Sequence, residues 1–373
     1  MIQFDNQVVR AATTGSTRMG NFSPTSLVFG PNEPDCFFES DPMGLLPYRG
    51  QDSAKERLTR YIGGLGLEHV RMKALLTGQA GTGKTTLARI IAHQLIDRQI
   101  DLGWDIGGSY WELLPSQVAA KQKLDEFMLA VTQDPYAVVF IDEVHELANR
   151  EALFHVLHDT GALKYPLESG RWIDVPPTIS WLAATTDPGA LDDTNGGALR
   201  RRLEPEIQLE APSKDDLAAI IQDQGVVDSL PVDDEAAVNI AERALFPWQA
   251  RFIYKEAKLS ARLAGANELT PTHAADAFRI MRIDRMGLLP EDRAVLAALL
   301  KLNGGKGIPV VSQPGVNLYK MGEESLCAIA GVDRITYKKR VQPKLFRLGL
   351  MVVRSGQCLT DRAVDEYGWL RYE

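Results

Sequence analysis

The sequence predicts an α/β fold, in which a doubly wound parallel sheet is followed by a small helical lid domain and a C-terminal winged-helix domain. Short, continuous apolar runs at residues 137–141 and 179–185 alternate with helical patterns, as strands buried on both faces of a parallel sheet do. After Pro212 the strand signals stop and helical patterns follow. A last segment combines a helix with short apolar strands near residues 350–353 and 358–360, which suits a two-stranded wing.

Local signals divide the chain into four units. An apolar run at residues 74–76 leads through a glycine-rich turn into a helix expected over residues 84–94. Ser213, with Asp216 three residues later, is a helix cap that opens the next unit. The four expected units are a loop-rich arm at 1–46, an α/β domain at 47–212, a helical lid at 213–286 and a winged helix at 287–373.

The composition excludes several protein classes. The chain has 373 residues, 45% of them hydrophobic and 24% charged, which is ordinary for a globular protein of two or three domains. Its cysteines Cys36, Cys327 and Cys358 are far apart, so neither a zinc site nor a disulfide framework is expected. No stretch approaches the roughly 20 apolar residues that cross a bilayer, and the N-terminus lacks an apolar signal core. We therefore expect a cytoplasmic protein with no membrane partner.

Charge is distributed unevenly. The net charge of −8 argues against a uniformly basic surface for nucleic acid. Residues 301–373, however, hold 12 Lys and Arg against 7 Asp and Glu. An acidic body with a basic C-terminal domain is the expected picture.

A phosphate-binding signature, GxxxxGK[ST], lies between a predicted strand and a predicted helix, as its mechanism requires. Its glycines let backbone N–H groups close around phosphates, and the following helix presents its positive end. Lys84 is expected to neutralise the β- and γ-phosphates, and Thr85 to give Mg²⁺ a hydroxyl ligand. A chance glycine-rich turn is the alternative. The expected ATP-binding residues are Gly78, Gln79, Ala80, Gly81, Thr82, Gly83, Lys84, Thr85 and Thr86.

Two carboxylates, Asp142 and Glu143, follow the apolar run at residues 137–141. They fall at the carboxyl edge of the predicted sheet, where open α/β sheets bind ligands. Asp142 is expected to hold Mg²⁺, directly or through water, and Glu143 to orient and activate the attacking water. The alternative is a pair of solvated carboxylates at the start of a helix. With the P-loop upstream, the pair predicts an ATPase that uses ATP and Mg²⁺.

Four stretches resemble, in the same order, the RuvB family of AAA+ ATPases, which drive branch migration of Holliday junctions. They are YRGQ at residues 48–51, GTGKTTLA at 81–88, FIDEVH at 140–145 and AATT at 183–186. Weaker likeness continues through residues 232–244, 287–293 and 345–352. The resemblance thus covers roughly residues 47–370. It implies a hexameric homo-oligomeric ring with ATP at each subunit boundary, and Tyr48 as a nucleotide contact.

The resemblance also implies roles for polar residues around the nucleotide. Thr186, with Thr185 beside it, would be a sensor for the γ-phosphate or the attacking water; the alternative is a hydroxyl that caps the next turn. Arg200 and Arg202 stand in the place of the arginine finger, and Arg202 aligns best. A finger from the next subunit contributes about 10³- to 10⁵-fold in rate. A solvated basic run or salt bridges between subunits are the alternative.

One position departs from the family pattern. The family has an arginine, the second sensor, directly after a proline in a lid helix, whereas here Trp248 follows Pro247. Arg251 lies three residues further along the same predicted helix, and we expect it to contact the nucleotide in place of the missing arginine. A structural surface arginine fits the sequence equally well.

A hairpin is expected over residues 163–173, with its turn at residues 168–170. In the family an equivalent hairpin docks the junction-binding protein RuvA, so the resemblance implies a RuvA-like adaptor contacting Tyr165, Arg171 and Trp172. Core packing of the aromatic residues is the alternative.

Basic residues gather near the C-terminus, on one predicted helix and on the presumed wing. Such residues bind phosphates without reading bases, which suits a motor that accepts any DNA sequence. A solvated helix face would carry the same charges. The candidate DNA-binding residues are Lys338, Lys339, Arg340, Lys344, Arg347 and Arg354.

Three functions are compatible with these patterns. The first is an ATP-driven motor of the RuvB type that moves duplex DNA, as in branch migration. The second is a clamp-loader-like or transposition-regulator ATPase, which would share the same catalytic residues. The third is a protein-remodelling AAA+ chaperone, for which we find no aromatic-hydrophobic pore loop. The expected winged helix favours the first.

Overall fold

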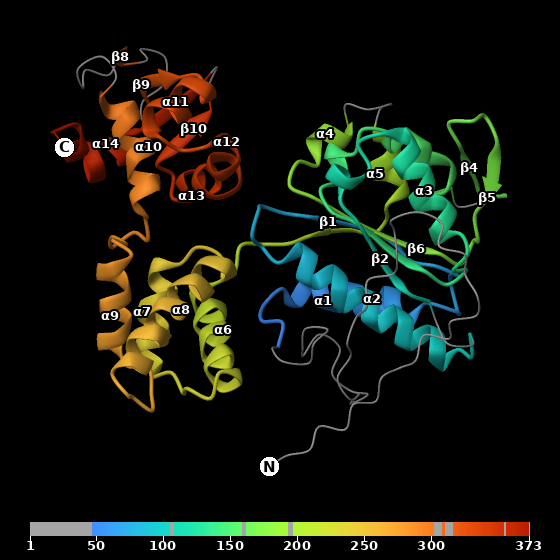
Figure 1. Ribbon diagram of the computed structural model, residues 1–373, viewed down its shortest axis with the longest axis horizontal. Helices are drawn as coiled ribbons and strands as arrows, with labels where there is room; N and C mark the ends of the chain where they lie inside the picture. Colours follow the sequence, from blue (N-terminus) through green and yellow to red (C-terminus); the bar gives the residue numbers. More distant parts are fainter. Residues whose placement is uncertain are drawn as a thin grey trace.

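The computed structural model describes residues 47–104, 108–158, 162–192, 197–301, 308–309, 316–353 and 356–372. The expected arm at residues 1–46 and the candidate Arg354 lie outside this described part. The predicted architecture of a parallel sheet with helices on both faces, a helical lid and a winged helix is confirmed (Figure 1). Among the described helices, none is both long and apolar enough to cross a membrane.

A five-stranded, all-parallel sheet forms the centre of the first domain. The strands at residues 73–77, 138–141 and 180–185 are short and almost wholly buried. Their burial on both faces of the sheet explains why their sequences are mostly continuous apolar runs. Two strands, at residues 110–113 and 206–208, were not expected, because neither YWEL nor EIQ forms a continuous apolar run. In order across the sheet the strands are β2 (Tyr110–Leu113), β3 (Val138–Ile141), β6 (Ser180–Thr185), β1 (Lys73–Thr77) and β7 (Glu206–Gln208).

Helices cover both faces of this sheet (Figure 1). On one face α1 (Asp52–Gly63) and α2 (Lys84–Asp101) share a hydrophobic cluster with alternate residues of the strands. On the other face α3 (Lys121–Val131) packs against the remaining strand residues, near the short helices α4 (Gly189–Asp192) and α5 (Ala198–Arg202). Helix α2 runs seven residues beyond the expected end at residue 94, because Leu95 and Ile96 continue its buried face.

Four helices form the lid. The expected cap is present, since Ser213 Oγ accepts a hydrogen bond from Asp216 N at 3.0 Å and Asp216 Oδ2 accepts one from Ser213 N at 3.0 Å. Two of the other helices begin with proline in their first turn, where the missing N–H costs nothing. The helices are α6 (Lys214–Val227), α7 (Asp234–Arg243), α8 (Pro247–Leu263) and α9 (Pro271–Ile280).

The C-terminal unit is a winged helix. Its wing consists of the two strands that the sequence predicted, β10 (Met351–Val353) and β11 (Gln357–Thr360), joined by β9 (Val316–Met321) and β8 (Ile308–Pro309). Its helices are α10 (Pro290–Lys301), α11 (Glu323–Ala330), α12 (Arg334–Thr336), α13 (Gln342–Arg347) and α14 (Asp361–Tyr367).

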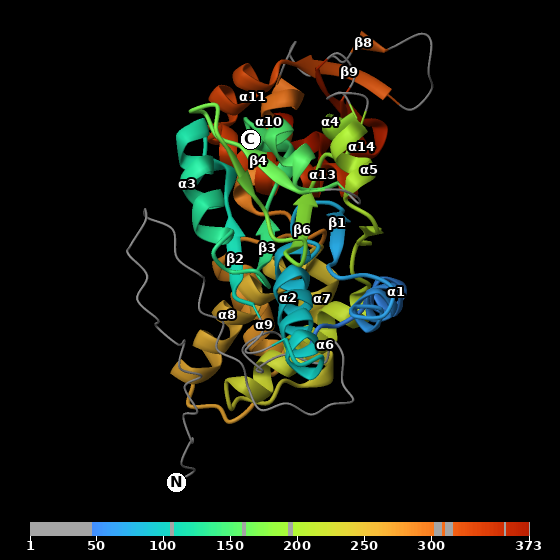
Figure 2. The same ribbon diagram turned by 90° about the vertical axis from the view of Figure 1, so that its right-hand side faces the viewer.

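A π-turn at Tyr337–Val341 joins α12 to α13, so residues 334–347 form one continuous helical segment, which we call the basic helix. The lid and the winged-helix domain lie one above the other in both views (Figures 1 and 2). Their hydrophobic clusters are built from residues 217–289 and 288–370, so they divide near the proposed boundary at residue 286.

Two of the expected DNA contacts have structural roles instead. Lys344 is 1% exposed and forms an ion pair with Asp292, which is also 1% exposed. Arg347 donates hydrogen bonds to Leu245 O and, at 3.1 Å, to Pro212 O, and burial lowers the pKa of its guanidinium. The expectation that these two side chains face DNA is therefore wrong: one lies in the core of the winged helix and the other joins it to the lid.

We expect Lys344→Met to lower the free energy of unfolding of the winged-helix domain by about 3–5 kcal/mol, because it removes the positive charge that is paired with the buried Asp292 carboxylate. Lys338→Met is the matched control on the same helix, since its side chain is 51% exposed. Chemical denaturation followed by circular dichroism measures both. Equal midpoints for the two variants would contradict the buried ion pair.

Candidate nucleotide-binding site

The P-loop connects the carboxyl end of β1 to the first turn of α2. Gly81 and Gly83 have φ angles of 82° and 94°, which favour glycine. Neighbouring side chains also leave no room for a Cβ atom. A methyl on Gly81 would lie 2.7 Å from Trp248 Cδ1, and one on Gly83 would lie 3.0 Å from Tyr48 Oη. The loop is therefore glycine-rich both for its backbone and for the two aromatic rings that close on it.

Lys84 points back into the loop. Its side chain is buried, and its Nζ donates to Gly78 O at 2.8 Å and to Gln79 O at 3.1 Å. Burial lowers the pKa of this ammonium, and the nearby carboxylates of Glu143 and Asp142 oppose that shift. A cation held inside a loop of backbone N–H groups is the arrangement that binds phosphate oxygens.

Thr85 and Asp142 meet at the same edge of the sheet. Thr85 Oγ1 donates to Asp142 Oδ2 at 3.3 Å. Burial, followed by the neighbouring Glu143 charge, raises the pKa of Asp142 above its usual range. A hydroxyl and a carboxylate together are the oxygen donors that Mg²⁺ prefers, so this pair fits the expected metal.

Glu143 is held in place by the end of β6. Its Oε2 accepts two hydrogen bonds from Thr186, from the backbone N and from Oγ1, both at 2.9 Å. The residue has φ 45° and ψ 54°, a left-handed conformation that is costly for a glutamate and occurs at functional sites. Thr186 thus contacts the expected catalytic carboxylate directly.

His145 extends this network, a role that the sequence did not reveal. Its Nδ1 lies 3.3 Å from Glu143 Oε2 and 2.9 Å from Thr185 Oγ1. The ring therefore links the carboxylate to Thr185, the first threonine of AATT. The sequence signal that could have indicated this role is the position of His145 at the end of the FIDEVH stretch.

Tyr48 and Trp248 lie against the P-loop, and Arg251 follows Trp248 three residues later on α8. The Tyr48 hydroxyl donates to Gly83 O at 3.5 Å, so this ring lies against the loop, and its contact with the nucleotide stays a prediction. Trp248, which replaces the family's arginine, contacts Gly81. The buried Nε of Arg251 has no hydrogen-bond partner within the described residues, a state compatible with an anionic ligand.

The two candidate finger residues differ in how they are held. Arg200 is paired within its own subunit, with Glu206 Oε2 at 2.7 Å and with Asp192 Oδ2 at 2.6 Å, and these bonds raise its pKa. Arg202 donates to Ala198 O at 2.9 Å and lies 5.4 Å from the centre of the Phe154 ring. Its Nη2 also lies 3.4 Å from His158 Nε2, so Arg202, unlike Arg200, is paired with no carboxylate among the described residues.

The expected hairpin is present, as β4 (Lys164–Pro166) paired with β5 (Trp172–Asp174). Tyr165, however, is buried, and its hydroxyl donates to Asp125 Oδ1 at 2.9 Å on α3. The expectation that Tyr165 contacts a partner is wrong, because its ring anchors the hairpin. Arg171 is exposed and Trp172 is 52% exposed, with its ring edge against His155.

The remaining basic candidates lie on the basic helix. Lys339 is exposed, and Lys338 lies 3.6 Å from the Glu323 carboxylate. The Arg340 guanidinium lies 5.0 Å from the centre of the Trp248 ring and 3.8 Å from Glu291. With Lys344 and Arg347 removed, these three residues remain as the described candidates for DNA contact, beside Arg334, which is exposed and paired with Glu323.

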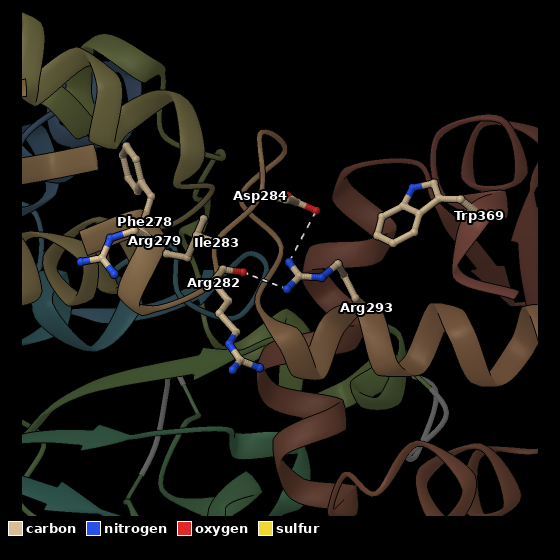
Figure 3. A pocket seen from close by; sticks show the side chains of 7 residues that line it. All are labelled: Phe278, Arg279, Arg282, Ile283, Asp284, Arg293 and Trp369. Carbon is tan, nitrogen blue, oxygen red and sulfur yellow. Dashed lines mark hydrogen bonds and ion pairs between the residues drawn. The ribbon is translucent and has the colours of Figure 1, made fainter. Parts of the chain in front are cut away.

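A pocket of about 490 Å³ lies at the junction of the lid and the winged helix, and all of its lining residues belong to positions 278–369 (Figure 3). Arg293 in it is committed to Asp284 at 3.8 Å and to Arg282 O at 2.9 Å. The side chains of Arg279 and Arg282 point away from Arg293. Because these guanidinium groups do not converge, the pocket is not an alternative phosphate site.

We expect Gly81→Ala to weaken ATP binding about 5- to 150-fold, since the new methyl meets Trp248 and the left-handed backbone is strained by about 1–3 kcal/mol. Gly170→Ala is the matched control: its φ of 81° is equally left-handed, but a Cβ there meets nothing within 4 Å. Equilibrium titration with a fluorescent ATP analogue measures both. Unchanged affinity in Gly81→Ala would show that phosphates do not depend on this loop.

Comparisons with known proteins agree with this geometry. The AAA family, described as ATPase family associated with various cellular activities (AAA), matches residues 74–211. The Thermotoga maritima RuvB Holliday junction branch migration motor is similar in structure, with a TM-score of 0.67 and 23% identity over 86% of this chain and 95% of that one.

Two further structures are similar. A mutant of the Thermotoga protein gives a TM-score of 0.69 at 23% identity, over 86% of this chain and 96% of that one. The Aeropyrum pernix ORC2 protein gives 0.52 at 16% identity, over 85% of this chain and 92% of that one. At such identities the likeness establishes the fold. Residues 74–211 therefore carry an ATPase domain of the AAA type, within a chain whose fold is similar to that of RuvB.

Proposed function

We propose that this ATPase is a ring-forming motor that hydrolyses ATP to move duplex or branched DNA. The observation that carries the proposal is the contact between Glu143 and Thr186, next to the P-loop, in a chain that ends in a winged helix. The carboxylate is positioned for catalysis, and the C-terminal domain offers a basic helix for a polyanion. The Thermotoga maritima RuvB, which is similar in fold, is a Holliday junction branch migration motor.

Each residue of the site has a distinct chemical task. The P-loop N–H groups and Lys84 bind the phosphates of ATP, while Thr85 and Asp142 hold Mg²⁺, which neutralises charge on the phosphates. Glu143 orients the attacking water and accepts its proton. Thr186 keeps the carboxylate in place through two hydrogen bonds.

Hydrolysis is completed by a neighbouring subunit. Within one subunit the described residues bring no arginine to the Glu143 carboxylate, and Arg202 lies on the short helix α5 with weak local ties. An arginine from the next subunit would supply the missing positive charge, so that activity requires assembly into a ring, hexameric as in the resemblance.

DNA and an adaptor would use separate surfaces. Lys338, Lys339 and Arg340 on the basic helix offer cations to phosphates in a way that does not depend on sequence. Arg171 and Trp172 on the hairpin offer an exposed aromatic and a cation, which are frequent in protein interfaces. We assign the first surface to DNA and the second to a RuvA-like adaptor.

We expect Glu143→Gln to lower the rate of ATP hydrolysis about 10²- to 10⁴-fold while ATP binding persists, because the amide cannot accept the proton of water. Glu146→Gln is the matched control, as that carboxylate is exposed three residues away. Steady-state phosphate release and nucleotide binding are measured on both. Full activity in Glu143→Gln would remove Glu143 from catalysis.

For Arg202→Ala we expect about a 10³-fold loss of the hydrolysis that duplex or four-way-junction DNA stimulates, with ATP binding intact. Mixing this variant with Lys84→Ala should restore part of the activity, because one subunit then supplies the arginine and the other the ATP site. Failure of the mixture would show that Arg202 does not act between subunits. If DNA leaves the wild-type rate unchanged, the substrate is not DNA.

A further inference from the structure

Trp248 lies between the P-loop and the winged helix. It occupies the first turn of α8, directly after Pro247. On one side its Cδ1 and Nε1 atoms lie 2.7 Å and 2.8 Å from where a Cβ of Gly81 would stand. Because glycine has no side chain, the indole edge rests on the backbone of the phosphate-binding loop itself.

On its other side Trp248 meets the basic helix. The Arg340 guanidinium lies 5.0 Å from the indole centre, and the Lys344 ammonium lies 5.9 Å from it. Phe246 stacks beside the indole, with ring centres 6.5 Å apart and planes 11° apart, and Arg347 lies 5.0 Å over that second ring. Two aromatic rings of the lid thus make cation–π contacts with three basic side chains of the winged helix.

Packing within the lid does not account for this tryptophan. The lid's hydrophobic cluster contains neither Trp248 nor Phe246. The indole is only half-buried, and within the described residues no acceptor is recorded for its N–H group. Its contacts lead instead to the loop on one side and to Arg340 on the other.

We propose that Trp248 is a positioning residue that couples the nucleotide state of the P-loop to the basic helix through Arg340. The backbone of Gly81 must adjust when its N–H group turns toward phosphate, and hard contact passes that displacement to the indole. Arg340 then either keeps its place over the ring or leaves it. The coupling concerns the chain's own domains and does not require DNA to be the substrate.

Arg340 is suited to this coupling because its other interactions are weak. Its nearest carboxylate, Glu291, is 3.8 Å away, and its side chain is 41% exposed. A guanidinium over a tryptophan contributes about 2- to 30-fold to an equilibrium. When the Arg340 guanidinium leaves the Trp248 ring, it can bind another partner. The nucleotide state of the P-loop therefore controls whether Arg340 is bound to the ring or exposed to that partner.

The test is hydrogen–deuterium exchange of residues 334–347 in the full chain, with and without a non-hydrolysable ATP analogue and Mg²⁺. We expect the analogue to change exchange in this helix in the wild type. Trp248→Leu and Arg340→Gln should reduce that change about 2- to 30-fold, whereas Trp248→Phe should retain most of it because it keeps an aromatic face. Phe252→Ala, an exposed position on the same helix α8, is the control that should respond as the wild type does.

Nucleotide affinity is measured on the same samples, which separates the outcomes. If the wild type binds the analogue but residues 334–347 exchange as before, the coupling is overturned and the ATPase assignment stands. A Trp248→Leu variant that responds fully would also overturn the role of the ring. If Trp248→Leu does not fold, Arg340→Gln tests the proposal alone. A change in exchange of residues 334–347 as large as in the wild type would then contradict coupling through Arg340. Absence of binding in the wild type would overturn the nucleotide site and the coupling together.

Discussion

The parallel pairing of β1, β3 and β6 is the constraint on which the nucleotide site depends. Since all three strands run the same way, their carboxyl ends meet at one edge of the sheet. The P-loop leaves β1, the acidic pair leaves β3, and the threonines end β6. The burial that lowers the pKa of Lys84 also raises that of Asp142, so the edge concentrates charged groups where phosphates and a cation would compensate them.

The parts that sequence predicted well are those in which chemistry is local. The P-loop is contiguous, and its glycines, lysine and threonine act through backbone geometry that the motif itself determines. The acidic pair and the threonine are short segments at strand ends, where an apolar run marks the strand and the polar residue follows. The capping box at Ser213 belongs to the same class, because its two partners are three residues apart.

The parts that sequence missed depend on contacts between distant segments. Tyr165 and Lys344 have polar groups and were expected at the surface. Both are buried instead, because Tyr165 bonds to Asp125 and Lys344 to Asp292, each at least 40 positions away along the chain. No pattern within either helix or hairpin marks such a partner. Trp248 could be seen as a departure from a family pattern, but its position between Gly81 and Arg340 required three domains to be placed together.

The seam between the lid and the winged helix has a mechanical consequence. Gln249 Nε2 donates to Gly287 O at 2.8 Å, and a Cβ on Gly287 would collide with Arg243 O, so the start of the winged helix is seated tightly on the lid. Arg347 adds a bond to Pro212 O, which lies at the linker from the ATPase domain. These contacts join the lid to the winged helix close to the linker, so a change in the direction of the linker would be felt by both domains.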